Sequence, residues 1–118
     1  MDGVAATLKR KLADLLREAA EVSVTLDRAE GTIVGVPHYS VIEARAHELG
    51  RQLSQQIQAQ QMQEIAVREG DTARCPGCGA RCETILKKRR VTSIGGHLTV
   101  DERVAKCPHC RRDFFPPA

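Results

Sequence analysis

Large aromatic side chains are nearly absent from this chain of 118 residues, which has no Trp, one Tyr and two Phe. It therefore lacks the exposed rings on which single-strand-binding sheets stack bases. Long apolar runs are missing too: no stretch of 18 or more apolar residues offers a membrane span, and no basic leader precedes an apolar segment of secretory type. We expect a cytoplasmic protein with no membrane partner, in which thiols stay reduced.

The usual arrangements of catalytic residues are also absent. The carboxylates fall mostly on the polar faces of expected helices, no Ser/His/Asp set is evident, and no glycine-rich phosphate loop is present. A chain of this length has room for one domain, or for a small metal domain plus a helical segment. We expect a noncatalytic module without a small-molecule substrate.

Two Cys-x-x-Cys motifs, separated by 28 residues, are the most informative feature present. Structural Zn²⁺ prefers a closed tetrahedron of Cys or His, and each motif presents two sulfurs from one tight turn. Pro76 and Pro108 stiffen the turns, while Gly77 and Gly79 let backbone amides point at the sulfurs. The spacing predicts one structural Zn²⁺ held by Cys75, Cys78, Cys107 and Cys110.

Other interpretations of the cysteines stay open. The second motif alone could be a redox site, but that needs a following helix to lower a thiol pKa, and eight residues follow Cys110. A rubredoxin-like iron site would be expected to have more aromatic neighbours. Cys82 is expected to pack as a small apolar residue, with exchange for one of the four ligands as the alternative. We expect His109 to face solvent or a phosphate, and His97 to lie in a hairpin turn.

The segment between the motifs has the pattern of a β-hairpin. Residues 83–94 and 98–104 contain β-branched residues, with alternation in the second run, and Gly95-Gly96-His97 supplies the turn. A long hairpin brings its two ends together, so the second motif returns beside the first. Because such a domain has little apolar core, much of its stability should come from the metal.

Charge divides the chain at about residue 70. Residues 1–70 carry 8 Lys+Arg against 10 Asp+Glu, whereas residues 71–118 carry 10 against 5. Four thiolates around one Zn²⁺ subtract two charges, and the second region stays basic. Such a surface suits phosphate, with a solvated strand face as the alternative. The expected nucleic-acid contacts are Lys87, Lys88, Arg89, Arg90, Arg103, Lys106, Arg111 and Arg112.

Residues 1–70 have the pattern of two helices. The first carries an apolar stripe at spacings of three and four: Leu8, Leu12, Leu15, Leu16, Ala19 and Val22. It should end before Gly31, Gly35 and Pro37. The second should start with Ser40 as N-cap and Glu43 as capping-box partner, and stop near Gly70. Its stripe is Ile42, Ala46, Leu49, Leu53, Ile57 and Ile65.

Seven glutamines lie between residues 52 and 63. Glutamine is a good uncharged helix former, so a solvated face is the simple explanation. The alternative is a coiled-coil seam with Gln56 and Gln60 in core positions beside Leu53 and Ile57. The second helix would be about 44 Å long, and nothing nearby could bury all of it. We therefore expect a homodimer or a protein partner on the helices.

The region from the first motif to the Phe114-Phe115-Pro116 element resembles the N-terminal zinc-ribbon region of certain bacterial insertion-sequence transposases. In that family a helical segment precedes the ribbon, and a Phe-Phe-Pro element closes it. The resemblance covers residues 40–117 at most. It implies recognition of transposon-end DNA.

This chain also departs from the family. Val104-Ala105-Lys106 replaces the aromatic residues expected before the second motif, and Arg111 replaces the glycine expected after it. The family's RNase H-like domain, with three acidic metal ligands, would begin where this sequence stops, so we expect either a truncated transposase or a natural short protein.

The sequence thus predicts an α+β chain, with a helical segment at 1–70 and a four-cysteine zinc ribbon at 71–118. The expected function is DNA binding, with RNA as an alternative nucleic acid. A protein-interaction adaptor acting through the helices is the second hypothesis, and a zinc-ribbon factor of transcription or translation is the third.

Overall fold

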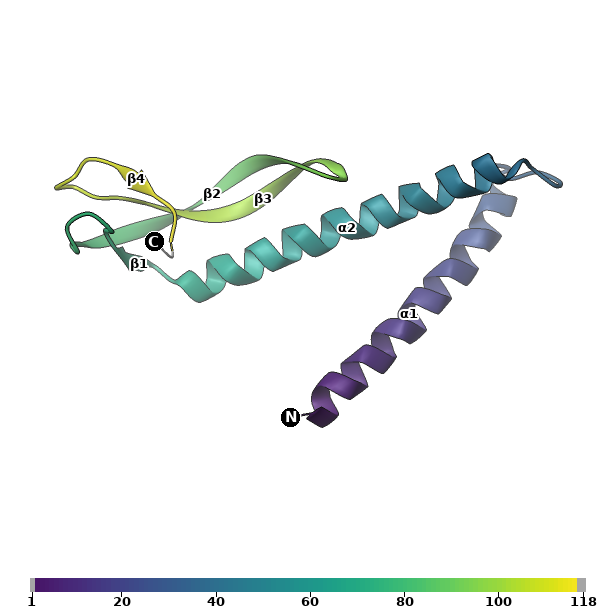
Figure 1. Cartoon of the computed structure of the whole chain (residues 1–118), viewed down its shortest axis with the longest axis horizontal. Coiled ribbons are helices and arrows are strands. Elements are labelled where there is room, and N and C mark those ends of the chain that lie inside the picture. The colour runs from purple at the N-terminus through teal and green to yellow at the C-terminus, as the bar shows by residue number, and fades with distance from the viewer. Residues whose placement is uncertain (1, 117–118) are drawn as a thin grey trace. The chain divides into compact units, whose positions relative to one another are not determined.

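The computed structural model describes residues 2–116 and places two helices before a four-stranded antiparallel sheet (Figure 1). Met1, Pro117 and Ala118 lie outside the described residues. The elements are α1 (Asp2–Ala29), α2 (Tyr39–Glu69), β1 (Thr72–Arg74), β2 (Arg81–Ser93), β3 (Gly96–Lys106) and β4 (Asp113–Phe114). The predicted α+β class and the order of helices and sheet are confirmed.

The chain divides into two compact units, Met1–Ala46 and His47–Ala118. The helical segment ends where the sequence predicted, because α2 stops at Glu69 and Gly70 adopts a φ of 74°. The division between compact units instead falls inside α2. In the first unit, Asp27 is 6% exposed and accepts hydrogen bonds from Arg45 Nε and Nη2 at 3.1 and 2.8 Å. This ion pair ties the end of α1 to the start of α2.

The start of α2 differs from the prediction. The backbone N–H of Ser40 donates to His38 Nδ1 at 3.1 Å, and that of Val41 donates to His38 O at 3.0 Å. Ser40 lies inside the first helical turn, so its assignment as N-cap is wrong. His38 takes that role because an imidazole nitrogen can accept from the same unpaired amide that a hydroxyl would cap.

The hairpin is formed by β2 and β3, which pair from Thr84 opposite Ala105 to Ser93 opposite Gly96. Its turn is Ile94-Gly95, so the predicted Gly95-Gly96-His97 turn is displaced. His97 lies in β3 opposite Thr92, and its Nδ1 is 3.0 Å from Thr92 Oγ1. The short strands β1 and β4, which the sequence did not predict, pair with β2 and β3 at the cysteine-rich end.

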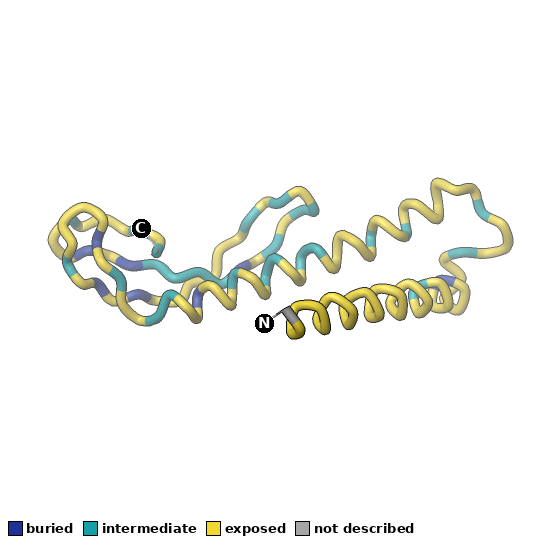
Figure 2. The backbone as a smooth tube through the Cα atoms, turned by 60° about the horizontal axis from the view of Figure 1, so that its bottom comes forward, coloured by how far each residue is buried: buried dark blue, intermediate teal, exposed yellow. Residues whose placement is uncertain are grey.

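Apart from Val100 in the middle of β3, the buried residues of the sheet region gather at this end (Figure 2). Cys75, Cys82, Ala105 and Cys107 form a core cluster, against which Ala80, Cys110 and Phe114 pack. Further along the hairpin Leu86 is 53% exposed and Ile94 is fully exposed. The sheet therefore has its core at the cysteines and little elsewhere.

The face of α2 that meets the hairpin is polar. Gln55 Nε2 donates to Gly95 O at 3.4 Å and His97 O at 3.3 Å, and Arg103 Nε donates to Ala66 O at 3.1 Å. The predicted apolar stripe stays exposed, as do Gln56 and Gln60. The glutamine that makes long-range contacts is therefore Gln55, not the pair assigned to a seam.

Among the helices in residues 2–116, none combines the length and apolar character that a bilayer span requires.

Candidate metal centre

The four predicted ligands come together. Their sulfur atoms all lie within 4.8 Å of one another, with Cys78 and Cys107 Sγ 3.5 Å apart and Cys75 and Cys110 Sγ 3.8 Å apart. A tetrahedral ion with metal–sulfur bonds of about 2.3 Å separates its ligands by about 3.8 Å. A disulfide requires about 2.05 Å, and all five cysteines are free thiols. The arrangement has the dimensions of a closed metal site.

The two turns have the same pattern of backbone hydrogen bonds. In the first, the N–H of Cys75 donates to Ala80 O at 2.9 Å and that of Gly79 donates to Cys75 O at 2.8 Å. In the second, Cys107 N donates to Arg112 O at 3.0 Å and Arg111 N donates to Cys107 O at 2.8 Å. Each pair of cysteines is therefore presented by a closed loop of the same size.

Backbone amides also point at the sulfurs, as the sequence predicted. Gly77 N donates to Cys75 Sγ at 3.4 Å, and Cys110 N donates to Cys107 Sγ at 3.3 Å. Amide donors stabilise sulfur in its charged form, which is the form that binds metal. The backbone of each turn therefore favours the thiolate form of its cysteines.

The thiols of Cys107 and Cys110 have pKa values that are shifted in opposite directions. The backbone N–H of Cys110 lowers the pKa of the Cys107 thiol to about 6, against the opposing effect of burial. Hydrogen bonds to the sulfurs of Cys78 and Cys75 raise the pKa of Cys110 to about 12. Because close thiolates repel one another, full ionisation of the four needs a cation among them. The donor set therefore fits a metal ion.

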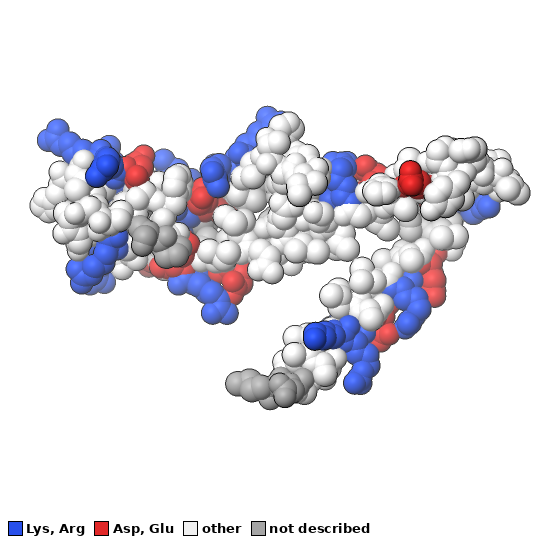
Figure 3. Space-filling model, in the orientation of Figure 1, with Lys and Arg blue, Asp and Glu red and all other residues white. Residues whose placement is uncertain are grey.

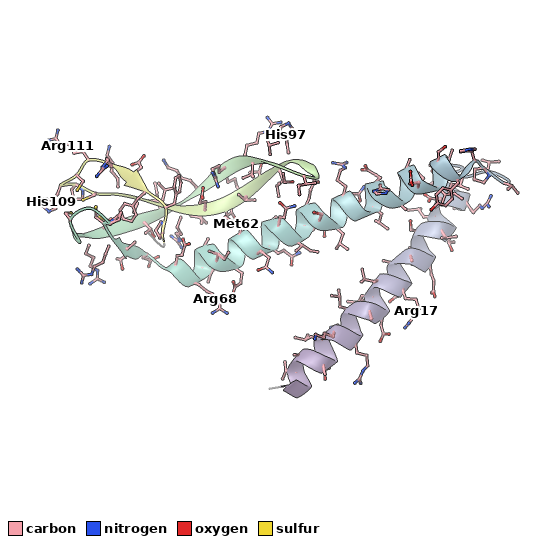
Figure 4. All side chains as sticks on the ribbon, in the orientation of Figure 1. Arg17, Met62, Arg68, His97, His109 and Arg111 are labelled. Atoms are coloured by element: carbon pink, nitrogen blue, oxygen red, sulfur yellow. The ribbon has the colours of Figure 1, made fainter. Side chains whose placement is uncertain are left out.

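Cys82 behaves as predicted, as a packed residue outside the metal group. It is 3% exposed and its Sγ donates to Ala80 O at 3.4 Å. Burial raises the pKa of this thiol, which favours its neutral form. His109 is exposed in the second turn, and Figure 4 shows it at the cysteine-rich end with Arg111. The chain after Cys110 forms β4, so the helix needed for the redox interpretation is missing from residues 2–116.

Three of the predicted nucleic-acid contacts are engaged in ion pairs. Lys88 Nζ lies 3.1 Å from Asp101, Arg89 Nε lies 2.7 Å from Glu102, and Arg103 Nη1 lies 3.9 Å from Asp71. The Arg89 guanidinium also lies 5.7 Å from the centre of the Phe115 ring. The run from Lys87 to Arg90 alternates between two strand faces and does not present four adjacent charges.

The remaining cations are concentrated near the cysteines. Of the ten Lys and Arg in the sheet region, seven have no carboxylate partner within the described residues, and five of these seven border the two turns or the adjoining strand ends. We call these five the cationic end: Arg74, Arg81, Lys106, Arg111 and Arg112. Figure 3 shows Lys and Arg side chains at this end. Lys87 and Arg90 are the other two.

Sequence reasoning missed Arg74 and Arg81. They are direct partners across β1 and β2, a placement in which like charges destabilise a sheet. Arg81 and Lys106 also line a groove of about 590 Å³, together with Lys87 and the carboxylates of Glu83 and Asp113. The sequence did indicate them, because Arg74 directly precedes the first Cys-x-x-Cys motif and Arg81 lies at the start of the hairpin.

In comparisons with protein-family models, curated proteins and solved structures, nothing matches this chain.

Proposed function

We propose that this chain is a noncatalytic zinc-ribbon module that binds nucleic acid, with DNA as the ligand. The observation that carries the proposal is the cationic end, where five cations that have no carboxylate partner among residues 2–116 surround the two cysteine turns. Like charges placed across one strand pair cost stability, and a bound polyanion removes that cost. Phosphate is the ligand chemistry that this end fits.

Zinc supports the function indirectly. Four cysteine ligands form a closed shell with no open position, which is the arrangement of a structural rather than a catalytic ion. Cys75, Cys78, Cys107 and Cys110 would hold it. By fixing both turns, the ion fixes the cations at their ends. The scarcity of aromatic residues disfavours base stacking, so backbone contacts to a duplex are the expected mode.

The resemblance to the ribbon region of insertion-sequence transposases supports DNA over RNA. The hairpin between two Cys-x-x-Cys turns and the short strand at Asp113–Phe114 are compatible with it. RNA duplexes serve as the comparison ligand in the test.

The test is fluorescence anisotropy with a labelled DNA duplex and the zinc-loaded full chain. With about five phosphate contacts, affinity should fall at least about 100-fold between 50 and 200 mM salt. The variant Arg81→Gln/Lys106→Gln/Arg111→Gln should lose at least about tenfold in affinity and show a shallower salt dependence.

The matched control is Lys88→Gln/Arg89→Gln, which removes two cations that already have carboxylate partners. It should bind within about threefold of the unmodified chain. Zinc content is measured for every variant. Equal losses in both variants would argue against a localised cationic end, and salt-independent binding would exclude phosphate contact altogether.

A specific observation favours a second function, interaction with another protein through the helices. The apolar stripe of α1 is exposed along its length, with Leu8 59% and Leu12 57% exposed. Such a surface is typical of a helix that binds a partner.

A further inference from the structure

The apolar side chains of α1 form an unbroken heptad seam. Spacings of three and four alternate through the helix, which is the repeat of a two-helix coiled coil. The a positions are Ala5, Leu12, Ala19 and Leu26, and the d positions are Leu8, Leu15, Val22 and Ala29. Leu15 is 51% and Val22 59% exposed. The seam is uncovered over the part of α1 that the structure describes.

We propose that α1 of a second copy of this chain covers the seam from Ala5 to Val22, in antiparallel orientation, with Leu12 of each copy facing Leu15 of the other. Successive layers then pair Ala5 with Val22, Leu8 with Ala19, and Leu12 with Leu15, each occurring twice about a two-fold axis. Ala5 and Ala19 therefore each meet a larger side chain. Facing layers that alternate small and large side chains fill the space evenly.

Other pairings fill the space less well. A parallel dimer stacks Ala5 on Ala5 and Ala19 on Ala19, which leaves thin layers between leucine layers. The corresponding repeat on α2 changes from Leu49 and Leu53 to Gln56 and Gln60, so leucines would meet glutamines. A second α1 is therefore the better partner for α1.

Charge at the edges of the seam favours the same orientation. Lys11 and Glu18 both occupy g positions, and the antiparallel pairing sets Lys11 of each copy against Glu18 of the other. Neither side chain has an ion-pair partner within residues 2–116, whereas Arg17 lies on the outer face and pairs with Asp14 at 2.6 Å. In a parallel dimer Lys11 would face Leu16 and Glu18 would face Ser23, which gives no attraction.

Sedimentation of the purified zinc-loaded full chain is the first test. We expect a dimer of about 26 kDa, twice the 13.0 kDa of one chain. Leu12→Gln/Leu15→Gln should raise the dissociation constant at least about 100-fold, because the two central layers are lost. Val24→Gln is the matched control, since Val24 is 66% exposed and lies opposite the seam, and it should remain dimeric. A monomeric chain at tens of micromolar overturns the proposal, and so does a dimer that tolerates the seam variant.

A charge exchange tests the orientation. Lys11→Glu should weaken the dimer about tenfold by placing Glu opposite Glu18 twice, and Lys11→Glu/Glu18→Lys should restore it. In a parallel dimer the single and the double exchange would have similar dissociation constants. Far-UV circular dichroism confirms that α1 remains helical in each variant, so that a loss of dimer reports the seam. Failure of the double exchange to restore the dimer overturns the antiparallel pairing.

Discussion

The two metal turns are built on the same hydrogen bonds and differ at the residue that follows the second cysteine. Gly79 occupies this position in the first turn with a φ of 75°, and Arg111 occupies it in the second with a φ of 56°. A left-handed conformation costs an L-residue roughly 1–2 kcal/mol and costs glycine almost nothing. The second turn thus bears a strain that the first avoids. The strained residue is Arg111, which also belongs to the cationic end.

Breaking either turn at its metal ligand should have the largest effect. Cys75→Ser and Cys107→Ser each remove one sulfur, and both should lose the metal and unfold β1 to β4. Both turns would hold the same ion, whose binding would contribute on the order of 10 kcal/mol to folding. Metal analysis and the dispersion of amide signals in two-dimensional NMR measure the outcome. Cys82→Ser is the control and should keep one ion per chain. Full metal content in either ligand variant would show that the turns act independently.

Acidification should release the metal with an intermediate effect. Because the pKa of Cys107 is lowered, its thiolate stabilises the fold fully above the ordinary thiol value of about 8.5. That contribution is lost as the pH falls through about 6. The metal favours the thiolate form of all four cysteines, including Cys110, whose own pKa is raised, so release should begin below pH 7 and be complete under more acidic conditions. A colorimetric chelator follows release from pH 8 to pH 4, and release beginning above pH 7 would contradict the charge distribution described for the second turn.

Exchanging the two residues that distinguish the turns should have the smallest effect. Arg111→Gly should stabilise the metal-loaded sheet by about 1 kcal/mol, and Gly79→Arg should destabilise it by about 1–2 kcal/mol. Urea denaturation of the zinc-loaded chain measures both. Under the proposed function Arg111→Gly also weakens DNA binding, so stability and affinity should change in opposite directions. Equal stabilities would mean that the left-handed position carries no strain.

The cluster of four cysteines could be predicted because its two halves are local in the sequence. Each Cys-x-x-Cys motif fixes two sulfurs within one turn, and the hairpin between them is marked by alternation and glycines. The ion pairs could not be predicted, because they depend on register. Placing the turn at Gly95-Gly96-His97 instead of Ile94-Gly95 shifts every cross-strand partner, so Lys88 would no longer meet Asp101.

For the helices, too, the sequence predicts local features but not the contacts between elements. The end of α1 and the two ends of α2 follow from glycine, proline and the capping pattern, within one or two residues. The choice of face does not, because the hairpin contacts the glutamine side of α2 and leaves Leu53 and Ile57 in solvent. The strands β1 and β4 have three and two residues, which are too few to carry a period.

The polar contact between Gln55 and the hairpin tip has a consequence for how that tip opens. The two bonds to Gly95 O and His97 O join an amide to carbonyls that water can also hydrate, and separating them exposes little apolar surface. Opening of the tip should therefore depend weakly on denaturant concentration, whereas loss of the cysteine core should depend on it steeply. Native-state hydrogen exchange in increasing urea would separate the two processes along a single hairpin.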